Sequence, residues 1–215
     1  MHALRGFYAI LDATSSGLDD VVALERQAAA LLAARPCALQ LRAKQAGARA
    51  FAAAARALQP FCRAAGVPLC VNDRMDVALA VGADIVHLGQ DDLPLADALR
   101  LRAEAGRPDL VVGFSTHNPV QAAAAAAAGA DYIGFGPVFA TASKLNPDPV
   151  VGLVQLAEIC AAVTIPVVAI GGISLTAVPA VAQAGASAAA CIAAVSSASD
   201  PTAAGLRVAA AFAVH

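Results

Sequence analysis

Short apolar segments alternate with longer alanine-rich segments along almost the whole chain. Eight of the short segments predict β-strands, because they are apolar, only a few residues long and enriched in residues that favour strands. They are residues 7–11, 37–43, 68–72, 85–89, 110–115, 132–136, 166–170 and 189–195. The alanine-rich segments predict helices, of which three cover residues 19–35, 48–65 and 118–130. Strands that are apolar on both faces and separated by helices indicate a parallel sheet covered on both sides.

Eight such strand–helix units predict an α/β fold, a single (β/α)8 TIM barrel with parallel strands. The length of 215 residues suits one barrel, and no linker or shift in composition marks a second unit. We therefore expect residues 1–215 to form one TIM-barrel catalytic domain.

The composition narrows the classes of partner. The chain is 59% hydrophobic and 14% charged, which suits a large core shielded by helices and argues against disorder. A net charge of −2 gives no reason to expect nucleic acid or an anionic membrane as a partner. Residues 159–199 carry no charge, but Pro166, Pro179 and several glycines divide them into pieces too short to span a bilayer. We expect no membrane partner.

The cysteines and the N-terminus predict a cytoplasmic protein. Five cysteines are an odd number, and no two of them form a CxxC pair, so they are interpreted as small buried hydrophobic residues in a reducing cytosol. The first residues lack the long apolar stretch and the cleavage site of a signal peptide. The sequence leaves open whether the chain forms a homo-oligomer.

In a TIM barrel the catalytic groups lie at the carboxyl ends of the strands, so the end of each predicted strand is a candidate site. At the end of the second strand, Gln40, Arg42 and Lys44 alternate and therefore share one face. Two cations and an amide on one face favour an anion site. The alternative is that Lys44 and Arg42 are simply solvated where the strand ends.

The third and fourth strands end in acids. Asn72 and Asp73 lie at the end of the third strand, and Gln90, Asp91 and Asp92 follow the fourth. Each group could merely form a turn and cap the next helix. Adjacent strands would, however, deliver these acids to the same rim, beside the cations of the second strand. Two carboxylates together with a substrate phosphate are a usual way for proteins to hold Mg²⁺.

Further candidates follow the remaining strands. Ser115 and His117 share a face, and His117 is either an acid/base or a structural residue. The loop 136–152 is long for a compact barrel, and its Thr141, Ser143 and Lys144 suit phosphate oxygens, although Lys144 alone would be an ordinary surface lysine. The glycines at 171–172 and the small residues after the eighth strand are typical of the phosphate site of this fold. His87 lies within a strand and is interpreted as a hydrogen-bonded core histidine.

Four segments, "LQLRAK", "VNDRMDVALAVGADIVHLGQDDLP", "GADYIGFGPVFATASK" and "IPVVAIGGIS", closely resemble the thiamine-phosphate synthase family, also called thiamine-phosphate pyrophosphorylase. The match runs in order over nearly the whole chain, and the NDR and HLGQDD motifs are its most specific part. The resemblance implies a Mg²⁺-dependent transferase of thiamine biosynthesis. It would couple 4-amino-2-methyl-5-hydroxymethylpyrimidine diphosphate with 4-methyl-5-(2-phosphooxyethyl)thiazole, giving thiamine phosphate and pyrophosphate through a dissociative, carbocation-like step.

The resemblance also implies roles for single residues. The catalytic residues would be Arg42, Lys44 and Lys144. The pyrimidine diphosphate would be held by Gln40, Arg42, Lys44, Asn72, Ser115 and Lys144, and the metal by Asp73 and Asp92. The thiazole phosphate would be held by Thr141, Ala142, Ser143, Gly172, Ile192 and Ala193. The chain departs from the family pattern at Ser143, where threonine is common, and at Ala193, where serine is frequent. If a side-chain hydroxyl is needed at Ala193, the affinity for thiazole phosphate would be weaker.

Three alternative functions remain at this point. A thiazole tautomerase of the same barrel family would use His117 for proton transfer and would not need an acid pair for a metal. A different phosphate-binding barrel, such as a sugar-phosphate epimerase, rests on fold analogy alone. A non-catalytic barrel that binds a phosphate ligand would show affinity without turnover. Retention of Asn72, Asp73, Gln90, Asp92 and Lys144 favours the synthase.

Overall fold

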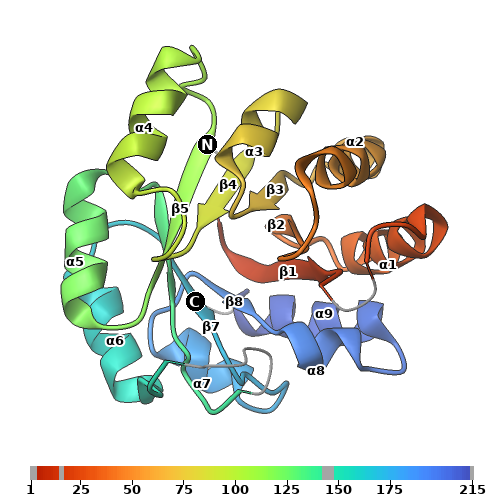
Figure 1. The fold of residues 1–215 in the computed structure, drawn as a ribbon. Coiled ribbons are helices and arrows are strands. Elements are labelled where there is room, and N and C mark those ends of the chain that lie inside the picture. The colour runs from red at the N-terminus through yellow and green to blue at the C-terminus, as the bar shows by residue number, and fades with distance from the viewer. Residues whose placement is uncertain (1–3, 15–16, 142–147, 214–215) are drawn as a thin grey trace.

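The computed structural model describes residues 4–14, 17–141 and 148–213, and eight parallel strands in it close into one barrel in the order of the chain (Figure 1). The strands are β1 (Gly6–Asp12), β2 (Ala38–Arg42), β3 (Leu69–Asn72), β4 (Ile85–Leu88), β5 (Val111–Thr116), β6 (Tyr132–Phe135), β7 (Val167–Ile170) and β8 (Ala188–Ala190). β1 also pairs with β8, which closes the sheet. The predicted TIM barrel with parallel strands is confirmed.

Helices connect the strands and surround the barrel (Figure 1). They are α1 (Val21–Ala33), α2 (Ala48–Ala65), α3 (Met75–Val81), α4 (Leu95–Glu104), α5 (Pro119–Ala128), α6 (Gly152–Ala162), α7 (Val178–Gln183), α8 (Ile192–Ser196) and α9 (Pro201–Ala211). The predicted helix 48–65 has the bounds of α2. The predicted helix 118–130 is shorter at both ends, because the Asn118 side chain accepts from the N–H of Gln121 and Gly129 ends α5 in the left-handed region.

The prediction of a strand over residues 189–195 is wrong beyond Ala190. β8 pairs with β7 only as far as the register Ile170 with Ala190. β7 stops there because Gly171 and Gly172 have φ values of 95° and 64°, which an extended strand does not allow. With β7 no longer beside it, the alanine-rich segment after Cys191 leaves the sheet and forms α8, in keeping with the high helix propensity of alanine.

The core has two layers, one inside the barrel and one between the barrel and its helices. The inner layer holds Tyr8, Ile10, Tyr132 and Val168, together with small residues from β2 and β8. The outer layer is much larger, and alanines on the helices let them approach the sheet closely. A Cβ at Gly205 in α9, for example, would lie 2.8 Å from the Phe7 ring. The high alanine content therefore reflects close helix–sheet packing.

Within the described ranges, no helix is long and apolar enough to cross a membrane. All five cysteines are free, and Cys62, Cys70 and Cys191 are buried, while Cys37 and Cys160 are partly buried. Burial raises the pKa of the Cys62 thiol from 9.0 to about 12, and the nearby Asp84 acts in the same direction. Burial also raises the pKa of Cys191 to about 12.

These thiols predict a loss of stability in mild alkali. Above pH 9 the thiols of the unfolded chain ionise, whereas the buried thiols stay protonated, so the unfolded state is favoured as the pH rises. The expected loss in the free energy of unfolding is about 1 kcal/mol between pH 9 and pH 10 for each such thiol. Urea unfolding at the two pH values measures it. Cys62→Ala should lose stability at both values but show a smaller difference between them, and an unchanged difference would contradict the prediction.

Candidate active site

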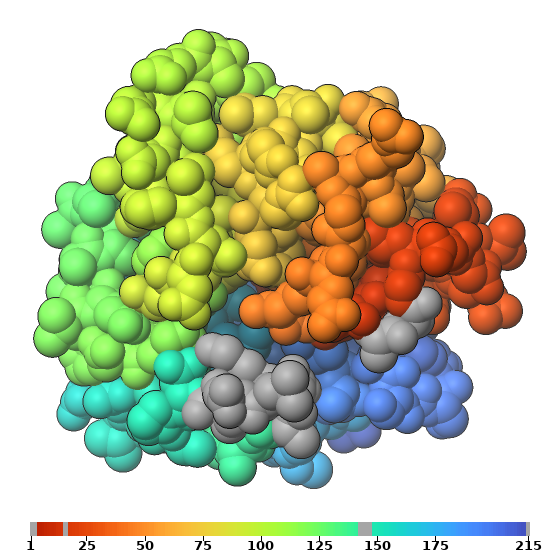
Figure 2. All heavy atoms as spheres, viewed as in Figure 1, coloured from red at the N-terminus to blue at the C-terminus, as the bar shows by residue number. Residues whose placement is uncertain are grey.

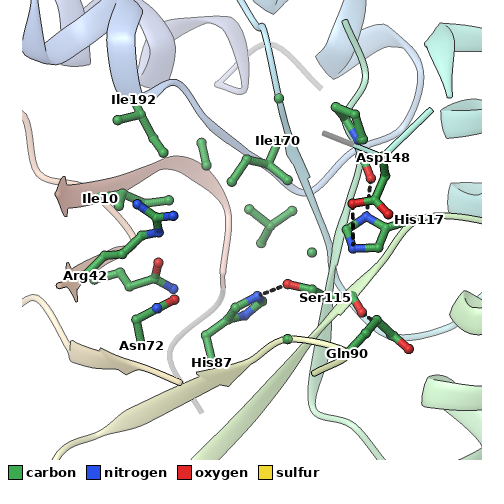
Figure 3. A pocket seen from close by; sticks show the side chains of 18 of the residues that line it. Ile10, Arg42, Asn72, His87, Gln90, Ser115, His117, Asp148, Ile170 and Ile192 are labelled. Carbon is green, nitrogen blue, oxygen red and sulfur yellow. Dashed lines mark hydrogen bonds and ion pairs between the residues drawn. The ribbon is translucent and has the colours of Figure 1, made fainter. Parts of the chain in front are cut away.

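A cavity of about 360 Å³ opens among the carboxyl ends of the strands. All eight strands contribute to its wall, and the loops after them form its mouth. Figure 2 shows the surface hollowed near its centre, between segments from the first half of the chain (orange and yellow) and the last part of the chain (blue). The close view in Figure 3 shows Arg42 and Asn72 on one side of the cavity and His117 with Asp148 on the opposite side.

The cationic side of the cavity is formed by β2 and the residue after it. Gln40, Arg42 and Lys44 all line the cavity, as their alternation predicts. The Arg42 guanidinium is not simply solvated, because it forms an ion pair with Asp12 and its Nη1 donates to Thr14 Oγ1 at 3.3 Å. Lys44 is exposed. The arrangement presents to the cavity one cation held in an ion pair, Arg42, and one exposed cation, Lys44.

The acidic side is formed by Asp73 and Asp92, after β3 and β4, and both line the cavity. The helix-cap interpretation does not apply to either, since α3 and α4 have no capping side chain. Asp92 instead accepts from the N–H of Gly89 at 2.6 Å, within its own turn. Burial raises the pKa of Asp73 to about 7, and the adjacent Asp92 carboxyl acts in the same direction. Lys44 and Arg42 oppose this effect without cancelling it.

Two like charges that share a half-buried position at neutral pH favour a bound cation or a shared proton. Asp73 is also held at φ 64°, a region that residues other than glycine seldom adopt. No cluster of three or more His, Cys, Asp or Glu suited to a metal occurs in the part of the chain that the structure describes. A cation here would have two protein carboxylates and would take its other ligands from water or substrate, which is the manner of Mg²⁺.

The far side of the cavity carries His117, which donates from Nδ1 to the carbonyl oxygen of Gly136 at 2.6 Å. Its Nε2 lies 3.5 Å from Asp148 Oδ2 (Figure 3). Its backbone N–H donates to Gln121 Oε1 at 2.7 Å. His117 is therefore held on both ring nitrogens and on its backbone, which fixes the ring against the wall.

The floor between these sides holds Ser115 and His87. His87 Nε2 lies 2.9 Å from Ser115 Oγ, and His87 Nδ1 lies 2.9 Å from the hydroxyl of Tyr132 (Figure 3 shows the first contact). Burial lowers the pKa of His87 to about 4, against a smaller opposite effect of Asp92, so the ring is neutral at neutral pH. The interpretation of His87 as hydrogen-bonded is confirmed, but its ring also lines the cavity.

The remaining side of the cavity wall is formed by the ends of β6, β7 and β8 and the segments that follow them. Thr141, Gly172 and Ile192 line the cavity, whereas Ala193 is exposed and does not. A Cβ at Gly172 would overlap the carbonyl oxygen of Ala140. The glycine is thus required for close packing of two loops, in addition to any ligand that approaches it. Ala142, Ser143 and Lys144 lie outside the described residues.

Several residues of the site were not found by sequence analysis. Asp12 ends β1 and contacts the cavity residue Arg42, and the rule applied to the other strand ends would have found it. Asp148 and Gln121 follow no strand end, so their approach to His117 carries no local signal. Tyr8 and Tyr132 look like ordinary core aromatics in sequence, yet both line the floor of the cavity.

The fold and the cavity wall define the class of protein, a (β/α)8 barrel with a polar site at the carboxyl ends of its strands. Cations and a pair of carboxylates meet at these strand ends, a combination that suits phosphate esters and a divalent cation. Comparison with known proteins then gives the family. The family model described as thiamine monophosphate synthase matches residues 7–195, and the chain belongs to that family.

Individual relatives agree with this. The chain is 47% identical over 209 residues to a thiamine-phosphate synthase of Anaeromyxobacter dehalogenans, covering 97% of this chain and 88% of the relative. It is 45% identical over 197 residues to a thiamine-phosphate synthase of Laribacter hongkongensis, covering 91% and 90%. Among solved structures, a thiamine phosphate pyrophosphorylase from Pyrococcus furiosus superposes with a TM-score of 0.84 at 33% identity, covering 99% of this chain and 97% of the other.

The ion pair of Asp12 with Arg42 predicts a measurable contribution to stability. Both side chains are largely buried, at 21% and 16% exposure, so Asp12→Asn leaves the guanidinium without its ion-pair partner. We expect a loss of about 1–3 kcal/mol in the free energy of unfolding. The matched control is Asp76→Asn, which breaks the exposed pair with Arg74 and should cost less than about 1 kcal/mol. Equal losses in urea unfolding of the two variants would contradict the prediction.

Proposed function

We propose that this chain is a thiamine-phosphate synthase. It joins 4-amino-2-methyl-5-hydroxymethylpyrimidine diphosphate to 4-methyl-5-(2-phosphooxyethyl)thiazole. The bond between the pyrimidine methylene carbon and the diphosphate oxygen breaks, a bond from that carbon to the thiazole nitrogen forms, and pyrophosphate leaves. Family membership over residues 7–195 supports the reaction, and both substrates are small molecules.

The observation that carries the proposal is the pairing of opposite charges at the ends of β2, β3 and β4. Arg42 and Lys44 lie close enough to Asp73 to lower its pKa, while the Asp92 carboxyl raises it. A diphosphate needs cations for its own oxygens, and a divalent ion that binds it needs carboxylates on its other side. Neither a thiazole tautomerase nor a simple phosphate binder requires both sets.

We assign Mg²⁺ to Asp73 and Asp92. The raised pKa of Asp73 supports this, because a like-charge pair is what a bound divalent cation would relieve. When bound, the ion would neutralise charge on the diphosphate and so make it a better leaving group. The alternative, that these acids are ordinary solvated surface residues, fits the structure less well, since both are half-buried in the cavity wall.

The other residues would position the substrates. Arg42, Lys44 and Lys144 would stabilise the departing diphosphate, with Gln40, Asn72 and Ser115 holding the rest of that substrate. Thr141, Ala142, Ser143, Gly172, Ile192 and Ala193 would hold the thiazole phosphate. In a dissociative step the thiazole nitrogen captures a pyrimidine carbocation directly, so the step needs little general base. His117 would then shape the wall of the site.

Product formation tests the function directly. Purified protein is incubated with both substrates, with Mg²⁺ or with excess chelator, and thiamine phosphate and pyrophosphate are measured. We expect both products in equal amounts, only in the presence of the metal. Tautomerisation of a thiazole precursor without thiamine phosphate would refute the synthase, as would binding of the substrates without turnover.

The metal assignment predicts the effect of Asp92→Asn. Asparagine keeps an oxygen for the N–H of Gly89 but removes the charge, so we expect kcat to fall by about two powers of ten, the scale of losing one group that stabilises developing charge. Mg²⁺ binding in the presence of pyrophosphate, measured by calorimetry, should weaken in parallel. Asp97→Asn, at a partly exposed position in the first turn of α4, is the control and should change neither value. Normal turnover of Asp92→Asn at moderate Mg²⁺ would exclude Asp92 as a ligand.

A further inference from the structure

A chain of hydrogen bonds crosses the floor of the cavity and ends at Ser115. Gln40 Nε2 donates to the Tyr8 hydroxyl at 3.1 Å, and that hydroxyl lies 2.9 Å from the hydroxyl of Tyr132. The Tyr132 hydroxyl is 2.9 Å from His87 Nδ1, and His87 Nε2 is 2.9 Å from Ser115 Oγ. Five strands, β1, β2, β4, β5 and β6, contribute to it, and its residues are separated in sequence by up to 124 residues. The proposed function uses only the two ends of this hydrogen-bond chain, Gln40 and Ser115.

The surrounding barrel makes room for these rings. A Cβ at Gly113 in β5 would overlap the Tyr132 ring, and a Cβ at Gly134 in β6 would lie 3.1 Å from Cε1 of His87. Tyr8 and Tyr132 are 2% and 0% exposed, and burial raises the pKa of both phenols well above 10, so both keep their hydrogens. Polar groups buried this deeply are tolerated only when they are hydrogen-bonded.

The donors and acceptors determine the direction in which hydrogens are donated along the hydrogen-bond chain. The Gln40 amide nitrogen can only donate, so it occupies an acceptor position on the Tyr8 oxygen. If the Tyr8 hydrogen then goes to Tyr132 and the Tyr132 hydrogen goes to His87 Nδ1, every group is satisfied. Nδ1 then carries no hydrogen, and the hydrogen of the neutral ring is on Nε2.

The reverse direction is less favourable. The Tyr8 oxygen would then accept from both Gln40 and Tyr132, and its own hydrogen would have to turn to the Cys70 sulfur. A thiol sulfur is a weak acceptor. Cys70 Sγ also already lies 3.6 Å from Gln40 Nε2, which donates toward it.

We propose that His87 is a positioning residue: as the Nε2–H tautomer it donates to Ser115 Oγ and so directs the Ser115 hydrogen into the cavity, toward an oxygen of the departing diphosphate. This inference rests on the proposed function. A neutral hydroxyl donor aimed at an oxygen that gains negative charge stabilises the transition state more than the substrate. With the opposite tautomer Ser115 would donate to the histidine and would present only lone pairs to the anion.

The tautomer can be measured without turnover. Nitrogen NMR of protein labelled at histidine distinguishes a protonated ring nitrogen from a bare one, and His87→Gln identifies the His87 signals. We expect Nε2–H in the wild type. Tyr132→Phe removes the donor to Nδ1 and should give a mixture of tautomers. Cys70→Ala is the control: it removes the acceptor that only the reverse direction needs and should leave Nε2–H unchanged. An Nδ1–H wild type would overturn the inference.

A double-mutant cycle tests whether His87 acts through Ser115. Ser115→Ala should lower kcat by about tenfold to a hundredfold, and Tyr132→Phe by a few-fold. In the Ser115→Ala background Tyr132→Phe should have less than a twofold effect, with the KM for the thiazole phosphate unchanged throughout. Equal effects of Tyr132→Phe in both backgrounds would mean that the hydrogen-bond chain supports the fold and does not act through Ser115. A wild type that makes no thiamine phosphate would instead refute the proposed function, and the NMR result would still stand.

Discussion

The parallel register of the first four strands is the constraint on which the site depends. Asp12 and Arg42 are direct partners in the ladder between β1 and β2, so their ion pair follows from the register itself. Asn72 is likewise opposite His87 in the ladder between β3 and β4. A slip of one residue would turn these side chains from the inner face of the barrel toward the helix layer. Closure of the barrel prevents such a slip, because each strand is held by a neighbour on both sides.

This arrangement places charges where burial makes them interact strongly. The carboxyls of Asp73 and Asp92 lie beside two cations, yet burial and mutual repulsion still raise the pKa of Asp73 to about 7. A surface pair would be screened by water and would show little of this effect. The acid pair is therefore an energetic cost that the folded chain carries, and it is the kind of cost that a bound divalent cation removes. Binding of the proposed Mg²⁺ at this pair would link the stability of the ion-free protein to the affinity for the ion.

Sequence alone predicted the fold class and most of the rim, and the reasons are physical. Periodicity fixes which residues of a strand share a face, so Gln40, Arg42 and Lys44 were correctly expected to lie together. Contacts that depend on the closure of the barrel were missed. The Tyr8 and Tyr132 hydroxyls meet across 124 residues, and nothing local to either residue indicates that contact. The end of β8 was missed because the strand stops where its partner β7 bends away, which is a property of the neighbour.

The two halves of the rim contribute by different means. From β1 to β5 the wall is built mainly by polar and charged side chains, whereas from β6 to β8 it is built mainly by glycines and apolar residues, with Asp148 as its one charged side chain among the described residues. Gly171 and Gly172 are in that second half because two loops pack against them too closely for any side chain. A diphosphate that must leave needs strong and fixed charges, while a phosphate that only anchors the second substrate can be held by backbone N–H groups. The asymmetry of the wall thus agrees with a reaction in which one phosphate group departs and the other stays.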